Sequence, residues 1–110
     1  MMNNIMLVGR LASEPSIEEL ESGKKVCKMN LAVNRSYKNA EGIYETDFID
    51  CILWDGLASN LAEYCHKGDV VGVRGRLETN LVEQEDGTNK KYTNVIAEKV
   101  TFLSSKKTDD

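Results

Sequence analysis

The sequence predicts an all-β fold, a small closed barrel of five strands with one α-helix between the third and fourth strands. Two patterns predict it: apolar and polar residues alternate with a period of two in several segments, and a single segment has helical spacing. The length agrees, because 110 residues suffice for one domain with a core and are too few for two. We expect residues 1–104 to form this domain and residues 105–110 to form a short polar tail.

The first two predicted strands flank a long connection. Residues 3–11 (NNIMLVGRL) form an apolar strand, and the polar stretch after it contains Pro15 and the pair Ser22-Gly23, which indicate turns. Residues 28–35 then alternate regularly between apolar and polar side chains. This alternation indicates a second strand.

A polar segment separates the second predicted strand from the third, and a fourth strand follows later in the chain. Residues 36–45 are polar and contain a glycine, so we expect a loop there. Residues 46–54 are expected to form the third strand and residues 69–77 the fourth. Gly72 and Gly75 inside the fourth strand suit the sharp bends of a small barrel.

One helix is predicted between these two strands. Leu57, Leu61 and Tyr64 recur at helical spacing. Lys67 is expected in the last turn, where a cation is favourable, and Gly68 is placed to end the helix.

A hairpin is predicted to complete the fold. Asp86-Gly87 separates residues 78–82 from residues 92–103, and this dipeptide favours a tight turn between two strands. Five strands with a helix between the third and fourth is the element order of the OB-fold, a Greek-key barrel. A two-layer sandwich would need about seven strands.

The residues that could perform catalysis or bind metal are few. Cys27, Cys51 and Cys65 are an odd number and lie in apolar patterns, so we interpret them as reduced packing residues. His66 adjoins Cys65, but this adjacency lacks the spacing of a zinc site. The sequence also has no glycine-rich phosphate loop or nucleophile motif. We therefore expect no enzyme activity, no cofactor, no metal and no small-molecule substrate.

Charge and hydropathy limit the cellular location and the classes of partner that we expect. No apolar run approaches the roughly 18 residues of a membrane span, and no signal segment precedes the first strand. A cytoplasmic protein without a membrane partner is expected. The formal net charge of −4 argues mildly against a nucleic-acid partner, although a binding groove needs only a local positive potential.

The third strand carries two aromatic residues on one face. If Ile49, Cys51 and Leu53 fill the barrel, Phe48 and Trp54 point outward, because a barrel has a single interior. Outward aromatics indicate a subunit interface or a surface on which bases stack. The reverse assignment, with both aromatics in the core, fits the alternation almost equally well.

Neighbouring residues favour the outward assignment. Arg35, Tyr37 and Lys38 surround the end of the second strand, and Arg74 and Arg76 point outward from the fourth. Aromatic rings stack on bases at ~1–3 kcal/mol each, and cations hold the phosphates of a single strand. This mixture of residues on one face of an OB-fold indicates single-stranded nucleic acid as the partner.

Several longer stretches resemble the bacterial single-stranded DNA-binding protein family. They run in the family's order and spacing through residues 3–103, and they read IMLVGRLASEP, MNLAVNRSYKN, ETDFIDCILWDGLASNLAEYCHKGD and VRGRLETN. The resemblance implies the OB barrel, assembled as a homotetramer around which DNA wraps. Apolar residues on both sides of the first strand independently predict an oligomer, because a single short helix cannot cover the outer side.

The family's binding residues carry over to this chain position by position. The loop aromatic falls on Tyr37, and the two outward aromatics of the third strand fall on Phe48 and Trp54. The GR of the first strand places Arg10, and the basic residue before the helix-ending glycine falls on Lys67.

The chain also departs from the family's pattern. Glu78, Leu81 and Val82 stand where the family usually has basic and aromatic residues, and Asp55 adds an acid after the third strand. Glu18 and Glu19 lie in a segment that is often basic, and the long linker with an acidic tip that recruits other enzymes is missing. The acidic substitutions suggest a specialised relative or one from a mobile element.

We expect sequence-tolerant binding and protection of single-stranded DNA in replication, recombination or repair. The alternative is an OB-fold interaction subunit that keeps the oligomer but binds DNA weakly or not at all. The expected stacking residues are Tyr37, Phe48 and Trp54, and the expected phosphate contacts are Arg10, Arg35, Lys38, Lys67, Arg74 and Arg76.

Overall fold

The computed structural model describes residues 1–105, and residues 106–110, which make up most of the predicted tail, lie outside the described residues. The described part forms one sheet in the order β1-β5-β6-β4-β3-β2. Its elements, in chain order, are β1 (Ile5–Leu11), β2 (Ile17–Glu19), β3 (Lys25–Lys38), β4 (Tyr44–Trp54), α1 (Asp55–Tyr64), β5 (Val70–Glu83) and β6 (Asn89–Ser104).

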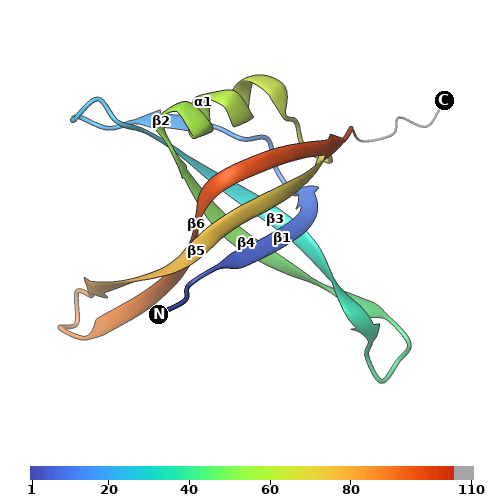
Figure 1. Ribbon diagram of the computed structural model, residues 1–110. Helices are drawn as coiled ribbons and strands as arrows, with labels where there is room; N and C mark the ends of the chain where they lie inside the picture. Colours follow the sequence, from blue (N-terminus) through green and yellow to red (C-terminus); the bar gives the residue numbers. More distant parts are fainter. Residues whose placement is uncertain (106–110) are drawn as a thin grey trace.

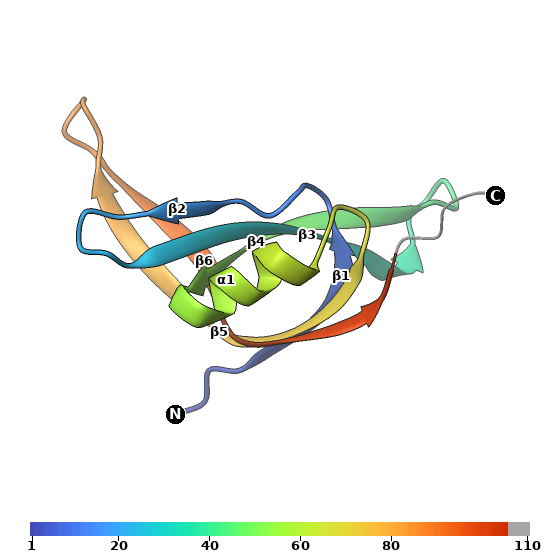
Figure 2. The same ribbon diagram turned by 90° about the horizontal axis from the view of Figure 1, so that it is seen from above.

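The sheet closes on itself through β1. This strand pairs with β5 along one edge and with β3 along the other, where Arg10 lies opposite Ala32 and Leu11 opposite Leu31. All strand pairs are antiparallel except β4 with β6. The helix α1 lies against one end of the barrel (Figures 1 and 2). The predicted all-β barrel with a single helix after its third long strand is confirmed.

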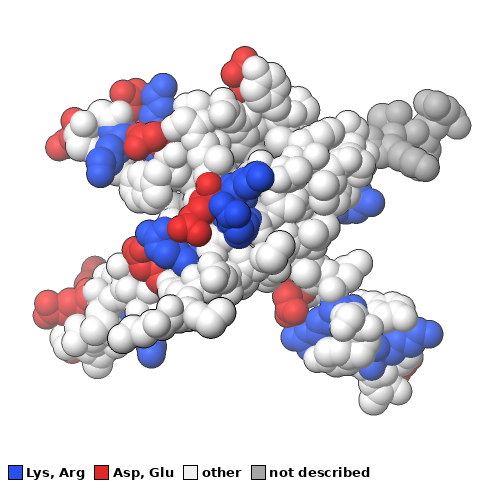
Figure 3. Space-filling model, in the orientation of Figure 1, with Lys and Arg blue, Asp and Glu red and all other residues white. Residues whose placement is uncertain are grey.

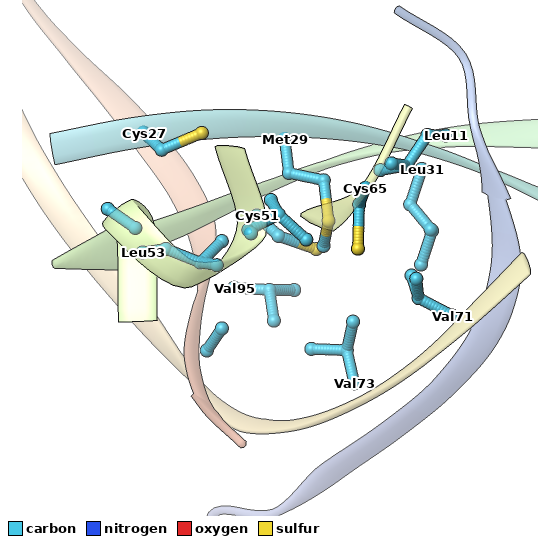
Figure 4. Close-up of a cluster of buried hydrophobic side chains, with 13 residues drawn as sticks. Leu11, Cys27, Met29, Leu31, Cys51, Leu53, Cys65, Val71, Val73 and Val95 are labelled. Atoms are coloured by element: carbon cyan, nitrogen blue, oxygen red, sulfur yellow. The ribbon is translucent and has the colours of Figure 1, made fainter. Parts of the chain in front are cut away.

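The barrel interior is a cluster of aliphatic and sulfur-containing side chains (Figure 4). The alternation of β3 and β4 produces it, because every second residue of a strand faces the same side. Fully or almost fully buried members are Leu11, Cys27, Met29, Leu31, Cys51, Leu53, Ala58 and Val71.

The three cysteines belong to this core. Cys27, Cys51 and Cys65 are unpaired and buried, as the sequence predicts. Burial raises the pKa of the Cys51 thiol to about 11, so this group stays neutral at physiological pH.

Two hairpins project beyond the barrel as two-stranded arms (Figure 1). The first arm corrects the prediction of a loop over residues 36–45, because β3 continues to Lys38 and β4 resumes at Tyr44. Asn39 closes the turn, and its Oδ1 accepts hydrogen bonds from the backbone N–H groups of Glu41 and Ile43. The segment is polar because both faces of this arm meet solvent, so its composition resembles that of a loop.

The second arm joins β5 to β6. The predicted division of β5 after residue 77 is absent, since pairing with β6 continues without interruption from Gly75 to Glu83. The predicted hairpin turn is confirmed: Gly87 has a positive φ of 85°. Asp86 Oδ1 accepts hydrogen bonds from the backbone N–H and the hydroxyl of Thr88.

A short sixth strand lies in the connection that we expected to be turns only. The three residues of β2 are all exposed and pair with β3, with Ile17 opposite Cys27. An exposed strand of this length has no buried face, so alternation of apolar and polar residues cannot reveal it.

The helix ends earlier than predicted. It stops at Tyr64, and Lys67 and Gly68 lie in the following turn rather than in its last turn. Gly68 has a φ of 93° and donates its N–H to the carbonyl of Leu11 at 2.8 Å. Gly68 therefore permits the turn that connects α1 to β5 and that lies against the end of β1. Leu61 packs into the core, whereas Tyr64 is mostly exposed.

Only one of the two predicted bend glycines in β5 is crowded. A Cβ on Gly75 would lie 2.1 Å from the carbonyl oxygen of Ile96, where the β5–β6 register shifts. A Cβ on Gly72 would meet nothing closer than 3.8 Å. Gly75 permits the close approach of the two backbones, and Gly72 has no such role.

Candidate nucleic-acid interface

The outer face of β4 carries the two aromatics singled out in the sequence. Phe48 is 65% exposed and Trp54 is 40% exposed, while Cys51 and Leu53 between them are fully buried. The outward assignment is therefore correct, and the reverse one is excluded. The two aromatic residues are six positions apart, which corresponds to roughly 20 Å along an extended strand.

A groove beside Phe48 brings three of the predicted residues together. Arg10, Phe48 and Lys67 line a hollow of about 660 Å³, together with Ala32. The groove forms where β1 meets β3, since Arg10 lies opposite Ala32 and Ala32 lies opposite Phe48. The small side chain of Ala32 leaves room between the ring and the two cations. A second hollow of about 440 Å³ shares Arg10, Ala32 and Phe48 and extends the groove.

Backbone interactions fix the cations of this groove. Arg10 Nη1 donates a hydrogen bond to the carbonyl of Gly68 at 2.9 Å. The backbone N–H of Lys67 donates to Glu14 Oε1 at 3.0 Å, and His66 Nδ1 lies 3.5 Å from the other oxygen of this carboxylate. Within residues 1–105, neither Arg10 nor Lys67 forms a side-chain ion pair. Both charges therefore remain available to a phosphate.

Arg35 lies apart from this groove. Its guanidinium binds the carboxylates of Asp47 and Glu45, with the shortest contacts at 3.0 Å and 2.6 Å. Val33 and Ile49, two residues away on each strand, pack against the core. Alternation therefore places the Arg35–Asp47 pair on the opposite side of the β3–β4 arm from Phe48.

The tip of the same arm adds an aromatic that the sequence analysis missed. Tyr44 is 53% exposed, and it shares the face of Phe48 because the two residues are four apart on β4. Lys38 lies over its ring, with Nζ 5.6 Å from the centroid. Tyr37 is also exposed. The loop predicted over residues 36–45 includes Tyr44, and extending the alternation of the third predicted strand by two residues reveals it.

The two predicted arginines of β5 are on another part of the barrel. Arg74 lies opposite Met6 of β1 and Lys99 of β6, and these residues line a separate hollow of about 270 Å³. Arg76 forms ion pairs with Glu78 and Glu98 at 3.1 Å and 3.4 Å. In Figure 3 basic and acidic side chains alternate over the centre of this face, so it carries no continuous basic stripe.

Two acidic residues that depart from the family's pattern, Asp55 and Glu78, each interact with a residue near them in the fold. Asp55 Oδ1 accepts the backbone N–H of Lys25 at 3.1 Å, and Asp55 has a positive φ of 51° at the start of α1. Its carboxylate thus ties the start of the helix to the start of β3. Glu78 forms an ion pair with Arg76.

The β5–β6 arm presents a second missed aromatic. Tyr92 is 42% exposed, and Lys90 Nζ lies 5.1 Å from its ring centroid. Leu81 and Val82 on the other strand of this arm are also exposed. This arm therefore offers apolar and aromatic surface at the positions where the chain departs from the family's pattern.

Other kinds of site find little support in the described part of the chain. Residues 1–105 contain no group of three His, Cys, Asp or Glu side chains that could hold a metal ion. Within the same range, α1 is too short and too polar to cross a membrane, and no other helix is present.

Comparison with known proteins agrees with this geometry. Residues 2–103 match the family described as the single-strand binding protein family. The chain is 46% identical over 106 residues to single-stranded DNA-binding protein B of Bacillus subtilis, an alignment that covers 96% of this chain and 94% of that protein.

Two further relatives differ in length. Single-stranded DNA-binding protein 1 of Clostridium acetobutylicum is 43% identical over 107 residues, covering 96% of this chain and 97% of that protein. The single-stranded DNA-binding protein of Oceanobacillus iheyensis is 43% identical over 106 residues, covering 96% of this chain and 66% of that protein. The similarity therefore spans the whole barrel in each case.

Proposed function

Since the chain belongs to the single-strand binding protein family, we propose that it binds and protects single-stranded DNA exposed during replication, recombination and repair. Binding is tolerant of sequence and involves no catalysis, cofactor or small-molecule substrate. The relatives are bacterial DNA-binding proteins, so the proposed location is the bacterial cytoplasm. Residues 1–104 form the binding domain.

One observation supports this function above the others: an outward aromatic and two unpaired cations line the same groove. Phe48 offers a ring on which a base stacks, and Arg10 and Lys67 line the same groove, where they can bind the adjacent phosphates. Trp54 continues the platform along β4, and Tyr44 and Lys38 extend it onto the arm. Tyr37 directly precedes Lys38 in β3 and lies near Arg35, so it serves a strand that passes the other side of the arm.

The cations contribute unequally to the proposed binding. Arg10, Lys67 and Lys38 carry most of the phosphate contacts near the platform, and Arg74 serves a strand that continues around the barrel. Arg35 and Arg76 contribute less, because each must exchange two carboxylates for a phosphate. The alternative of an interaction subunit with weak DNA binding is not favoured by the family membership or by the groove.

The binding unit is proposed to be a homotetramer. Met6 and Val8 on the outer side of β1 are 80% and 60% exposed, and an apolar strand face of this kind is normally covered by a partner. A second copy of the chain is the proposed partner.

Trp54 fluorescence tests the function directly, because the chain contains a single tryptophan. Saturation with an oligo-dT should quench its emission. Trp54→Ala should weaken binding, measured by the anisotropy of labelled oligo-dT, by about 1–3 kcal/mol. Tyr64→Ala is the control, since Tyr64 is an exposed aromatic on α1 and is not part of the platform. Unchanged emission with no change of anisotropy at low salt would refute the proposal.

A further inference from the structure

An acidic residue lies in the middle of the stacking platform. Asp50 is exposed on β4, two residues after Phe48 and four before Trp54. Because side chains of a strand alternate, all three share the outer face. The Asp50 position is about 7 Å from Phe48 and about 13 Å from Trp54 along the strand. A DNA strand stacked on both rings must pass over this carboxylate.

One neighbour orients the Asp50 carboxylate, and no lysine or arginine of residues 1–105 forms an ion pair with it. Asn30 lies directly opposite on β3, and its Nδ2 donates a hydrogen bond to Asp50 Oδ1 at 2.9 Å. Within residues 1–105, Asp50 forms no ion pair with a lysine or arginine, and no hydrogen bond to its Oδ2 occurs. Asn30 thus holds one oxygen of the exposed carboxylate, and the other oxygen remains open to a donor.

The chemistry of this group suits base edges and not the DNA backbone. An ionised carboxylate is only an acceptor, and it repels phosphates. Cytosine, adenine and guanine carry an exocyclic amino group that can donate to it, as in the known pairing of acidic side chains with cytosine N4. Thymine offers a single ring N–H between two carbonyl oxygens, which repel a carboxylate. In a single strand these edges are free to be read.

We propose that Asp50 reads bases, favouring those with an exocyclic amino group over thymine at the position next to Phe48. The preference is superimposed on stacking, which itself accepts every base. Asn30 positions the carboxylate, and the open Oδ2 accepts the amino hydrogen. This inference rests on the proposed function, because it needs a strand lying on the outer face of β4.

The test compares oligo-dC with oligo-dT of equal length, in the same buffer at neutral pH, for the parent and for Asp50→Asn. Both oligomers are pyrimidines with little structure of their own. The introduced asparagine has the same shape as the aspartate and keeps an oxygen that accepts the hydrogen bond from Asn30. It lacks the negative charge, and its amide N–H groups can donate to a carbonyl oxygen of thymine. Glu63→Gln on α1 is the control, since it removes the same charge from an exposed position away from the platform.

The measured quantity is the ratio of the two dissociation constants, Kd for dT over Kd for dC. Asp50→Asn should lower this ratio by roughly three- to tenfold, the equivalent of one hydrogen bond of ordinary net strength. Glu63→Gln should leave the ratio at the parent value. An unchanged ratio in Asp50→Asn overturns the inference, even if both oligomers bind more tightly, because the carboxylate would then act only by its charge.

The same experiment separates this inference from the function on which it rests. If the parent binds both oligomers and the ratio is the same in Asp50→Asn, the proposal of single-strand binding is supported. The proposal that Asp50 distinguishes bases is then wrong. If the parent binds neither oligomer at low salt, both are wrong.

Discussion

Arg35 donates hydrogen bonds to both carboxylate oxygens of Asp47, from Nε to Oδ2 at 3.1 Å and from Nη2 to Oδ1 at 3.0 Å. Nη1 of the same guanidinium donates to Glu45 Oε2 at 2.6 Å. A guanidinium presents its donors in a planar fork, and here two carboxylates occupy both ends of the fork. A residue that the sequence alone assigns to phosphate binding is therefore already neutralised within the arm.

Removing the two carboxylates should convert Arg35 into a phosphate ligand. In the double variant Glu45→Gln/Asp47→Asn, the affinity for oligo-dT should rise. The plot of log K against log salt should steepen by about 0.7, the value of one added contact in a single strand. Arg35→Ala in the parent should change the slope far less, since Glu45 and Asp47 already bind this guanidinium. Salt titrations of the three proteins provide the measurement. If the double variant keeps the parent slope, the strand does not pass along this side of the arm.

The same pair predicts a pH dependence. Hydrogen bonds from Arg35, together with its charge, hold the pKa of Asp47 below its ordinary value. A carboxyl with a lowered pKa in the folded state stabilises the fold above its unfolded pKa of about 3.9. That contribution is lost as the pH falls through the lower, folded pKa. Both side chains are only partly buried, so the effect on stability should be small and screened by salt.

Side-chain carboxyl chemical shifts followed against pH measure this directly. Arg35→Ala should raise the pKa of Asp47 toward its ordinary value. Asp86 is an internal control, because hydrogen bonds from Thr88 lower its pKa independently of Arg35. Asp86 should titrate identically in both proteins. A pKa of Asp47 that does not move would mean that the ion pair is not formed in solution.

The fold and the site differ in how far the sequence predicts them. The alternation of β4 separates Cys51 and Leu53 from Phe48 and Trp54, because side chains of a strand alternate between two faces. It did not show which face is buried, and the cations and aromatic residues nearby indicated the outward assignment that the structure has. The same logic fails where burial is absent. The arm around residues 36–45 and the three residues of β2 expose their strands to solvent, so nothing in their composition distinguishes a strand from a loop.

The charges of the site could not be predicted because their effect depends on register. Arg76 and Glu78 are two apart in the sequence and visibly close, but Glu98 joins them only through the shifted pairing of β5 with β6. Arg35 and Asp47 meet because β3 and β4 are paired. A single sequence shows how many cations are present, and only the pairing of the strands shows which of them are free.

The two glycines of β5 give a prediction about stability. Gly75→Ala should destabilise the fold by about 1–3 kcal/mol, the usual cost of forcing atoms into a packed site, because its Cβ would overlap the Ile96 carbonyl. Gly72→Ala is the matched control from the same strand and should be neutral or stabilising by up to about 1 kcal/mol, since glycine is unfavourable inside a strand. Denaturant unfolding measures both. Equal effects of the two substitutions would show that the β5–β6 register shift does not bring the backbones this close.

The outer side of β1 gives a prediction about assembly. The parent protein should scatter light as a species with four times the mass of one chain. Met6→Glu/Val8→Glu should shift it to smaller species, because two charges would have to be buried in the proposed contact. Leu81→Glu is the control, since Leu81 is 71% exposed, as apolar as Met6, and lies on the β5–β6 arm away from β1. It should leave the mass unchanged. Dissociation by Leu81→Glu with no effect of the double substitution would place the subunit contact on the arm and leave the outer face of β1 to another partner.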